Sequence, residues 1–225
     1  MVMNNSDDSF IREVNEELRS EQIQNVWKRF RPLIIGVAVL IVLGVAGAAL
    51  FEWWQARESS ASGDRFISAV KDASDNKPDQ AMKELEALGK DGFGSYPVLA
   101  RMRLATLKAD KGDAKGAIAD FNALGQDAAV PAPVRNAAKL RAAWLMVDNN
   151  SYEDLASAVE ELAAASSPLR NSAREVLGLS AYKAGNYAKA RDWLQLVLDD
   201  KESSSGAKTR ARTVLALITA SGKLS

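Results

Sequence analysis

Catalysis by this chain would have to use carboxylate, lysine, serine or tyrosine side chains, because the sequence contains no histidine and no cysteine. A Cys/His zinc site, a disulfide framework and a His or Cys nucleophile are therefore excluded. Neighbouring carboxylates such as Glu84 and Glu86, or Glu160 and Glu161, lie in predicted helices among cations, where a solvated face is the usual explanation. The sequence has no Gly-rich phosphate loop, dinucleotide fingerprint or nucleophile elbow. We expect no enzyme, no cofactor and no metal site.

Charge and length set two further limits on function. The chain has 225 residues, with 29 lysines and arginines against 29 aspartates and glutamates, so its formal net charge is zero. A protein that binds nucleic-acid phosphates needs a basic surface, and this balance argues against a nucleic-acid partner. The stretch after residue 55 is long enough for one domain with its own hydrophobic core.

The most apolar segment runs from Pro32 to Phe51 and contains twenty consecutive uncharged residues. At a rise of about 1.5 Å per residue, a helix of this length matches a hydrocarbon core of roughly 30 Å. Trp27 precedes the segment and Trp54 follows it, at positions where amphipathic rings favour the membrane interfaces. We therefore predict one transmembrane helix over residues 32–54.

A cleaved signal peptide is the alternative, since Ala46-Gly47-Ala48 fits a small-x-small cleavage pattern. Two features favour an uncleaved anchor instead. The preceding region is 31 residues long and carries six acidic side chains, and the apolar run continues past the cleavage pattern to Phe51. A buried core helix is also disfavoured, because no other segment is apolar enough to surround this one.

Positive charges on the two flanks predict the orientation of the segment. Four cations lie before it and two shortly after it, namely Arg19, Lys28, Arg29 and Arg31 against Arg57 and Arg65. The more cationic flank stays in the cytoplasm, so we expect a cytosolic tail over residues 1–31 and an exported C-terminal part. In a bacterium this describes a single-pass inner-membrane protein with a periplasmic domain.

The cytosolic tail is predicted to contain an amphipathic helix. Phe10, Val14 and Leu18 recur at four-residue spacing, and charged residues such as Glu13 and Glu17 occupy the other side. Two interpretations stay open. The helix is either a docking element for a partner or for the membrane surface, or a simple extension of the transmembrane segment.

Beyond Glu58 the sequence is rich in alanine, charged residues and helix formers. Four short breaks interrupt it, at residues 75–78, 111–113, 148–151 and 184–186. Each break separates two amphipathic stretches of about a dozen residues, so the pattern predicts a series of helical hairpins.

The segments that follow the four breaks align with one another. One aligned position holds Ala81, Ala117, Leu155 and Ala190, and the position four residues later holds Leu85, Phe121, Val159 and Leu194. The aligned positions are 36, 38 and 35 residues apart. A small residue lets the helices of a hairpin approach closely, and a large residue one turn later fills the adjacent space. The chain therefore contains a helical repeat.

This repeat resembles the tetratricopeptide repeat, whose unit of about 34 residues carries Leu-Gly in its first helix and Ala-x3-Phe in its second. Leu177-Gly178 and Ala117-x3-Phe121 match that pattern, although the Trp of the first helix is missing. The resemblance implies an all-α fold, with a single N-terminal transmembrane helix followed by a tetratricopeptide-like helical-hairpin solenoid.

The solenoid is expected over residues 55–225 and ends in a capping helix over residues 205–220. The first helix of each pair lines its concave face, where a groove suits a peptide or a partner helix. On the aligned register this face contains Phe66, Met102, Leu140, Trp144, Leu179 and Tyr182. Trp144 and Tyr182 are the candidate aromatic anchors, and ordinary packing between helices is the alternative for any one of these residues.

Over its whole length the chain is similar to one bacterial family, the YfgM-like ancillary subunits of the SecYEG translocon. The likeness rests on the tail IREVNEELRSEQIQNVWKRF, one N-terminal anchor, and degenerate repeats with the stretch LGLSAYKAGNYAKARDWL. It implies an inner-membrane protein that sits beside the translocon and passes emerging proteins to periplasmic chaperones. The implied partners are the translocon, these chaperones, unfolded exported proteins and the lipid bilayer, with no small-molecule substrate.

A second hypothesis belongs to a different class of function. The chain is also similar to periplasmic tetratricopeptide proteins that serve as scaffolds for cell-envelope or cell-division machinery. A translocon subunit would bind many clients weakly, because tight binding would trap them. A scaffold would instead hold one fixed and folded partner.

Overall fold

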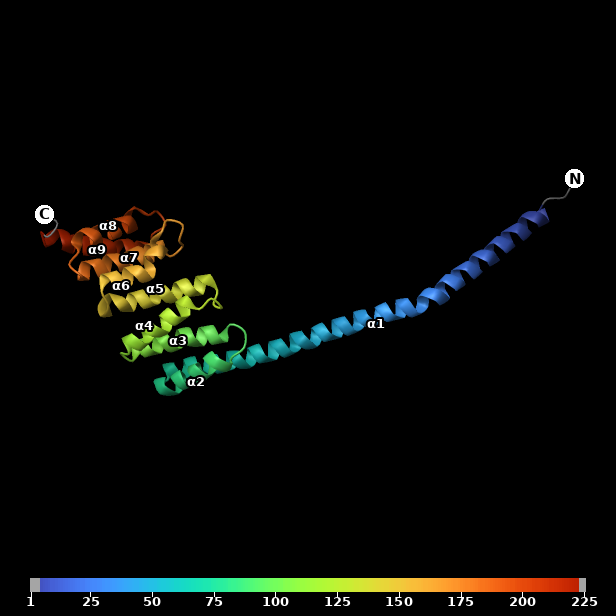
Figure 1. The fold of residues 1–225 in the computed structure, drawn as a ribbon, viewed down its shortest axis with the longest axis horizontal. Coiled ribbons are helices and arrows are strands. Elements are labelled where there is room, and N and C mark those ends of the chain that lie inside the picture. The colour runs from blue at the N-terminus through green and yellow to red at the C-terminus, as the bar shows by residue number, and fades with distance from the viewer. Residues whose placement is uncertain (1–4, 223–225) are drawn as a thin grey trace. The chain divides into compact units, whose positions relative to one another are not determined.

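The structure is a computed structural model that describes residues 5–222, without the side chains of residues 5–26, 28, 29 and 34. Over this range the secondary structure is helical and contains no β-strand, which confirms the predicted all-α fold (Figure 1). The chain divides into two compact units, the first ending at Glu58 and the second beginning at Ser59.

The first helix, α1, runs from Asn5 to Ser74 and therefore continues across the boundary between the units. It contains a stretch long and apolar enough to cross a membrane, with a mean hydropathy of 2.9 and none of its residues buried. Leu33 and Leu40, for example, are 62% and 70% exposed. Apolar side chains exposed on every side of a helix need an apolar surrounding, which a bilayer supplies. This finding rests on the length and the composition of the helix, and a signal sequence meets the same two criteria.

The expected domain boundaries at residues 31/32 and 54/55 both fall inside α1, so no helix end marks them. Pro32 also lies inside the helix. The apolar stripe expected in the tail lies on side chains outside the described residues and stays a prediction.

In the second unit the end of α1 is followed by eight further α-helices within the described part of the chain. Their bounds are Pro78–Asp91 for α2, Tyr96–Asp110 for α3, Ala114–Gln126 for α4, Ala132–Asn149 for α5, Tyr152–Val159 for α6, Arg170–Lys183 for α7, Tyr187–Asp199 for α8 and Ser205–Ala220 for α9. The four predicted breaks separate α1 from α2, α3 from α4, α5 from α6, and α7 from α8. The predicted series of hairpins is thus confirmed.

Local sequence explains where the second helix of a hairpin begins. Gly112 and Gly185 have φ angles of 87° and 76°, a left-handed conformation that glycine adopts without steric cost. The side chains of Asp113, Ser151 and Asn186 then accept a hydrogen bond from the backbone N–H three residues further on. These N-caps satisfy backbone donors at the starts of α4, α6 and α8.

The aligned repeat positions form the contact between the helices of each pair. All eight are buried, and none is more than 2% exposed: Ala81, Leu85, Ala117, Phe121, Leu155, Val159, Ala190 and Leu194. At the Leu-Gly motif, a Cβ atom added to Gly178 would lie 2.7 Å from Cγ of Leu194. This distance is shorter than carbon atoms tolerate, so glycine is required for α7 to approach α8 this closely.

Core side chains gather in three clusters that follow one another along the stack. The first cluster joins α1, α2 and α3, the second joins α3, α4 and α5, and the third extends from α5 to α9. Helix α9 contributes four buried residues at helical spacing to the third cluster, namely Ala207, Ala211, Val214 and Ile218. Each helix therefore packs mainly on its neighbours in sequence, as in a repeat solenoid.

The third hairpin differs from the expected pattern because its second helix is short. Helix α6 has eight residues and is followed by a 3-10 helix, η1, over Glu160–Ala163. At Val159 the backbone has φ −135° and ψ −3°, outside the α-helical region, which ends the regular turn there. The chain then reaches α7 through residues 164–169.

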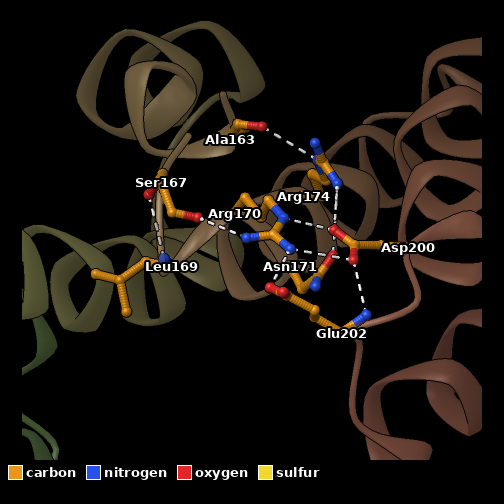
Figure 2. Close-up of polar contacts among 8 residues, drawn as sticks. All are labelled: Ala163, Ser167, Leu169, Arg170, Asn171, Arg174, Asp200 and Glu202. Carbon is orange, nitrogen blue, oxygen red and sulfur yellow. Dashed lines mark hydrogen bonds and ion pairs between the residues drawn. The ribbon is translucent and has the colours of Figure 1, made fainter. Parts of the chain in front are cut away.

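A cluster of charged side chains holds this connection in place (Figure 2). Arg170 Nε donates a hydrogen bond to Asp200 Oδ2 at 2.5 Å, and Arg174 Nη1 donates to the same oxygen at 3.1 Å. Arg174 Nε also donates to the carbonyl oxygen of Ala163 at 3.1 Å. The carboxylate of Asp200 thus links the start of α7 to the loop between α8 and α9, and Arg174 links η1 to both.

Asp200 is held in its charged form by this arrangement. The hydrogen bond from Arg170 and the backbone N–H of Glu202 keep the pKa of its carboxyl group well below the usual range. A carboxyl group with a lowered pKa in the folded state contributes stability above its ordinary pKa, and this contribution is lost as the pH falls toward the lower value.

The first prediction concerns acid stability. We expect the urea midpoint of the full chain in detergent to fall as the pH drops below about 4, where an ordinary aspartate begins to bind a proton. Asp200→Asn should lower the midpoint at neutral pH and flatten this acid-dependent fall. The control is Asp199→Asn, because Asp199 is exposed and accepts a hydrogen bond from Gln195 of the same helix. An Asp200→Asn chain as stable as the parent at pH 7 would contradict the prediction.

The second prediction concerns the repeat contact. Leu194→Ala removes a fully buried side chain and should destabilise the second unit by about 2–5 kcal/mol. Leu196→Ala, on the same helix, removes a side chain that is 44% exposed and should cost no more than about 0.5 kcal/mol. Urea unfolding followed by circular dichroism measures both. Equal losses would mean that the aligned positions do not form the inter-helix contact.

Candidate functional site

The six residues expected on the concave face all lie on first helices of the hairpins. Phe66 is on α1, Met102 on α3, Leu140 and Trp144 on α5, and Leu179 and Tyr182 on α7. All except Trp144 are half-buried and pack against one of the three core clusters. Trp144 is 38% exposed. Five of these side chains therefore take part in packing between helices, and one presents a substantial apolar surface.

Trp144 lines a small groove, of about 230 Å³, formed by α3, α4 and α5. Phe121, which is 2% exposed, and Leu145 supply further apolar surface. Two side chains of opposite charge, Asp110 and Arg141, also line it. Arg141 Nη1 donates a hydrogen bond to Thr106 Oγ1 at 3.4 Å, which joins α5 to α3 beside the indole ring.

The second candidate anchor is placed differently. Tyr182 packs edge-on against Tyr187 at the start of α8, with ring centroids 5.7 Å apart. It is not among the described residues that line the Trp144 groove. Phe66 likewise contacts another aromatic ring, that of Tyr96, at 6.2 Å. Trp144 is thus the one of the six predicted residues that lines this groove, and the role of all six in binding stays a prediction.

A larger groove lies on the second helices α2 and α4, with α3 between them. Its volume is about 560 Å³. Its charged residues are largely paired with one another or with adjacent side chains, through Lys90–Glu86 at 2.8 Å, Arg101–Asp127 at 2.7 Å, Lys108–Asp120 at 2.6 Å, and Lys111–Asp79. The hydrogen bond from Lys90 lowers the pKa of Glu86, and that from Arg101 lowers the pKa of Asp127. Each of the three carboxylates that line this groove is therefore paired with a lysine of the chain itself.

A third groove, of about 530 Å³, lies between α6 and α8. Trp193 Nε1 donates a hydrogen bond to Tyr152 Oη at 3.0 Å, and the two rings form part of its wall. The ammonium group of Lys189 lies 4.8 Å from the centre of the Tyr152 ring, within range of a cation–π contact. Leu196 is 44% exposed beside them. Sequence analysis missed this groove, although Tyr152 and Trp193 belong to the aligned second helices.

The described residues hold no group of three or more Asp or Glu side chains arranged to bind a metal ion. Their strongest polar cluster, around Asp200, links helices and leaves its carboxylate bonded to two arginines. Of the described surfaces, the grooves with exposed aromatic or aliphatic side chains are thus the features suited to binding. Such surfaces typically contact other proteins.

Comparison with known protein families identifies the repeat. The family model of the tetratricopeptide repeat-like domain matches residues 24–215, a range that includes the apolar stretch of α1. No curated protein and no solved structure matches the chain. Domains of this kind are typically non-catalytic modules for protein–protein interaction. Since the match covers most of its length, the chain belongs to the tetratricopeptide repeat-like domain family.

Proposed function

We propose that the protein is a membrane-anchored interaction module that acts as an ancillary subunit of the protein translocon. In this role it contacts exported proteins as they emerge and passes them to periplasmic chaperones. Membership of the tetratricopeptide repeat-like family supports the interaction role. The apolar stretch of α1 supports the anchor, and the similarity of the tail and repeats to YfgM-like subunits supports the place beside the translocon.

The observation that carries the proposal is the exposed indole of Trp144 in an open groove of α3, α4 and α5. At about 230 Å³ this groove is smaller than the roughly 300–1,000 Å³ of small-molecule sites. It suits single apolar side chains of a passing chain rather than a whole ligand. A contact of this size gives weak binding and fast release, which transfer of unfolded proteins requires.

The third prediction tests this groove in living cells. A photo-crosslinking amino acid at position 109, where Ala109 lines the groove, should capture translocon subunits together with many different exported proteins. Trp144→Ala should reduce capture of the exported proteins severalfold, because it removes the main exposed apolar surface. Mass spectrometry identifies the captured proteins.

The control probe replaces Leu217 on α9, which is 51% exposed and does not line the groove. Circular dichroism checks that Trp144→Ala remains folded. Capture that Trp144→Ala leaves unchanged would remove this groove from the mechanism. A single envelope or division protein, retained in fixed stoichiometry through purification, would instead identify a scaffold.

The fourth prediction tests the anchor and its orientation. Because the chain contains no cysteine, one cysteine introduced at Ser6 or at Ser205 is a unique label site. With the outer membrane permeabilised and the inner membrane intact, an impermeant maleimide should label the Ser205→Cys chain and leave the Ser6→Cys chain unlabelled. The asymmetry of flanking cations is the reason for this expectation. The reverse pattern, or loss of an N-terminal epitope tag from the mature chain, would overturn the proposed topology.

A further inference from the structure

We propose that the groove between α6 and α8 is a second docking surface, and that it binds a basic amphipathic helix of a partner protein. The partner places two cationic side chains against Glu153 and Glu160 and two apolar side chains between them, on Trp193 and Leu196. This surface lies on second helices, so the inference does not depend on the Trp144 groove or on the function proposed for it.

The residues on the two sides of the groove are of types that suit the binding of a helix. Small residues, Ala156 and Ser157, line it on the α6 side and allow close approach of another backbone. Trp193 and Leu196 line it on the α8 side and offer apolar surface. The hydrogen bond between Trp193 and Tyr152 fixes the indole in place before any partner arrives. Because the indole is already held in place, less side-chain conformational entropy is lost on binding.

The charged side chains around the groove determine which kind of helix it can bind. Helix α6 and the following η1 carry four carboxylates and no cation, namely Glu153, Asp154, Glu160 and Glu161. All four side chains are exposed, and within the described part of the chain none of them forms a salt bridge at 4 Å or less. Asp192, whose carboxylate pairs with Arg191 at 3.3 Å, is a third carboxylate in the groove lining, where Lys189 is the single cation.

The groove on α2 and α4 provides an internal comparison. The two grooves have similar volumes, about 560 and 530 Å³, and each is lined by residues of two second helices. In the first, lysines and arginines of the chain itself neutralise the carboxylates, as in the pairs Lys90–Glu86 and Lys108–Asp120. In the second, Lys189 contacts a tyrosine ring and leaves Glu153 and Glu160 without a cation. The missing positive charge is what a basic partner would supply.

The spacing of the two carboxylates sets the pattern of the partner. Glu153 lies in the first turn of α6 and Glu160 directly follows its last residue, so the two carboxylates that line the groove stand near the two ends of α6, about 10 Å apart along its axis. A partner helix with cations at positions i and i+7 has the same separation. Its residues at i+3 and i+4 lie on the same face and reach the surface of Trp193 and Leu196.

The fifth prediction uses a synthetic probe with this pattern. The probe is a fluorescein-labelled, alanine-rich helical peptide with lysines at positions i and i+7 and leucines at i+3 and i+4. A second peptide carries glutamates in place of the two lysines. The full chain is held in nanodiscs of neutral lipid, and fluorescence anisotropy measures binding, with empty nanodiscs as the blank.

We expect the lysine peptide to bind and the glutamate peptide to bind at least tenfold more weakly, because the groove is acidic. Replacing both Glu153 and Glu160 by glutamine should lower the affinity for the lysine peptide roughly threefold to tenfold, the effect of losing two exposed ion pairs. Raising the salt concentration should also lower the affinity for the lysine peptide. Leu196→Ala should reduce binding without changing the charge.

The matched control is Glu86→Gln, which removes an exposed carboxylate from the groove on α2, α3 and α4. This variant should leave the affinity for the peptide unchanged. Trp144→Ala should also leave it unchanged, which separates this surface from the one proposed for client proteins. Equal affinity for the two peptides, or full affinity in the Glu153→Gln, Glu160→Gln chain, would overturn the inference. Both glutamates are exposed, so unchanged urea midpoints should accompany these variants.

Discussion

Close approach of the two helices within each hairpin is the constraint on which the rest of this structure depends. Gly178 shows it most directly, because even one methyl group there would meet the buried side chain of Leu194. At the aligned position of the second helices α2, α4 and α8, the small residues Ala81, Ala117 and Ala190 are fully buried. Packing at this distance buries the surface that the two helices of a pair share. Each pair therefore contacts the next pair through its outer surfaces.

Such a stack leaves grooves between helices of successive pairs, and their chemistry differs from place to place. The groove beside Trp144 is small and largely apolar, whereas the one between α6 and α8 is acidic at Glu153 and Glu160. At the end of the stack, Asp200 and its two arginines hold α7 against the loop that leads into α9. The position of α9 thus depends on charge-assisted hydrogen bonds as well as on apolar burial.

Sequence analysis predicted the hairpins and their contacts well, because both follow from local patterns. The breaks contain glycine, asparagine or an N-capping side chain, and these act within three or four residues of themselves. Prediction of the binding face was less complete. Helical spacing placed Met102, Leu140 and Tyr182 on first helices, but it could not tell which side chains a neighbouring pair would half-bury. The early end of α6 at Val159 had no clear signal in the periodicity either.

The amino-acid sequence by itself determined the apolar stretch of α1, the all-α hairpin pattern and the repeat of small and large residues. Each of these depends on neighbours along the chain, through helical periodicity and turn chemistry. The tertiary structure alone decided that Trp144 stays exposed and that Asp120 on α4 meets Lys108 on α3. It also decided that, within the described part of the chain, Glu153 and Glu160 meet no cation. The physical reason is that burial and charge pairing depend on side chains a whole repeat away, such as the 30 residues between Arg170 and Asp200. No local pattern records which of those distant residues will come into contact.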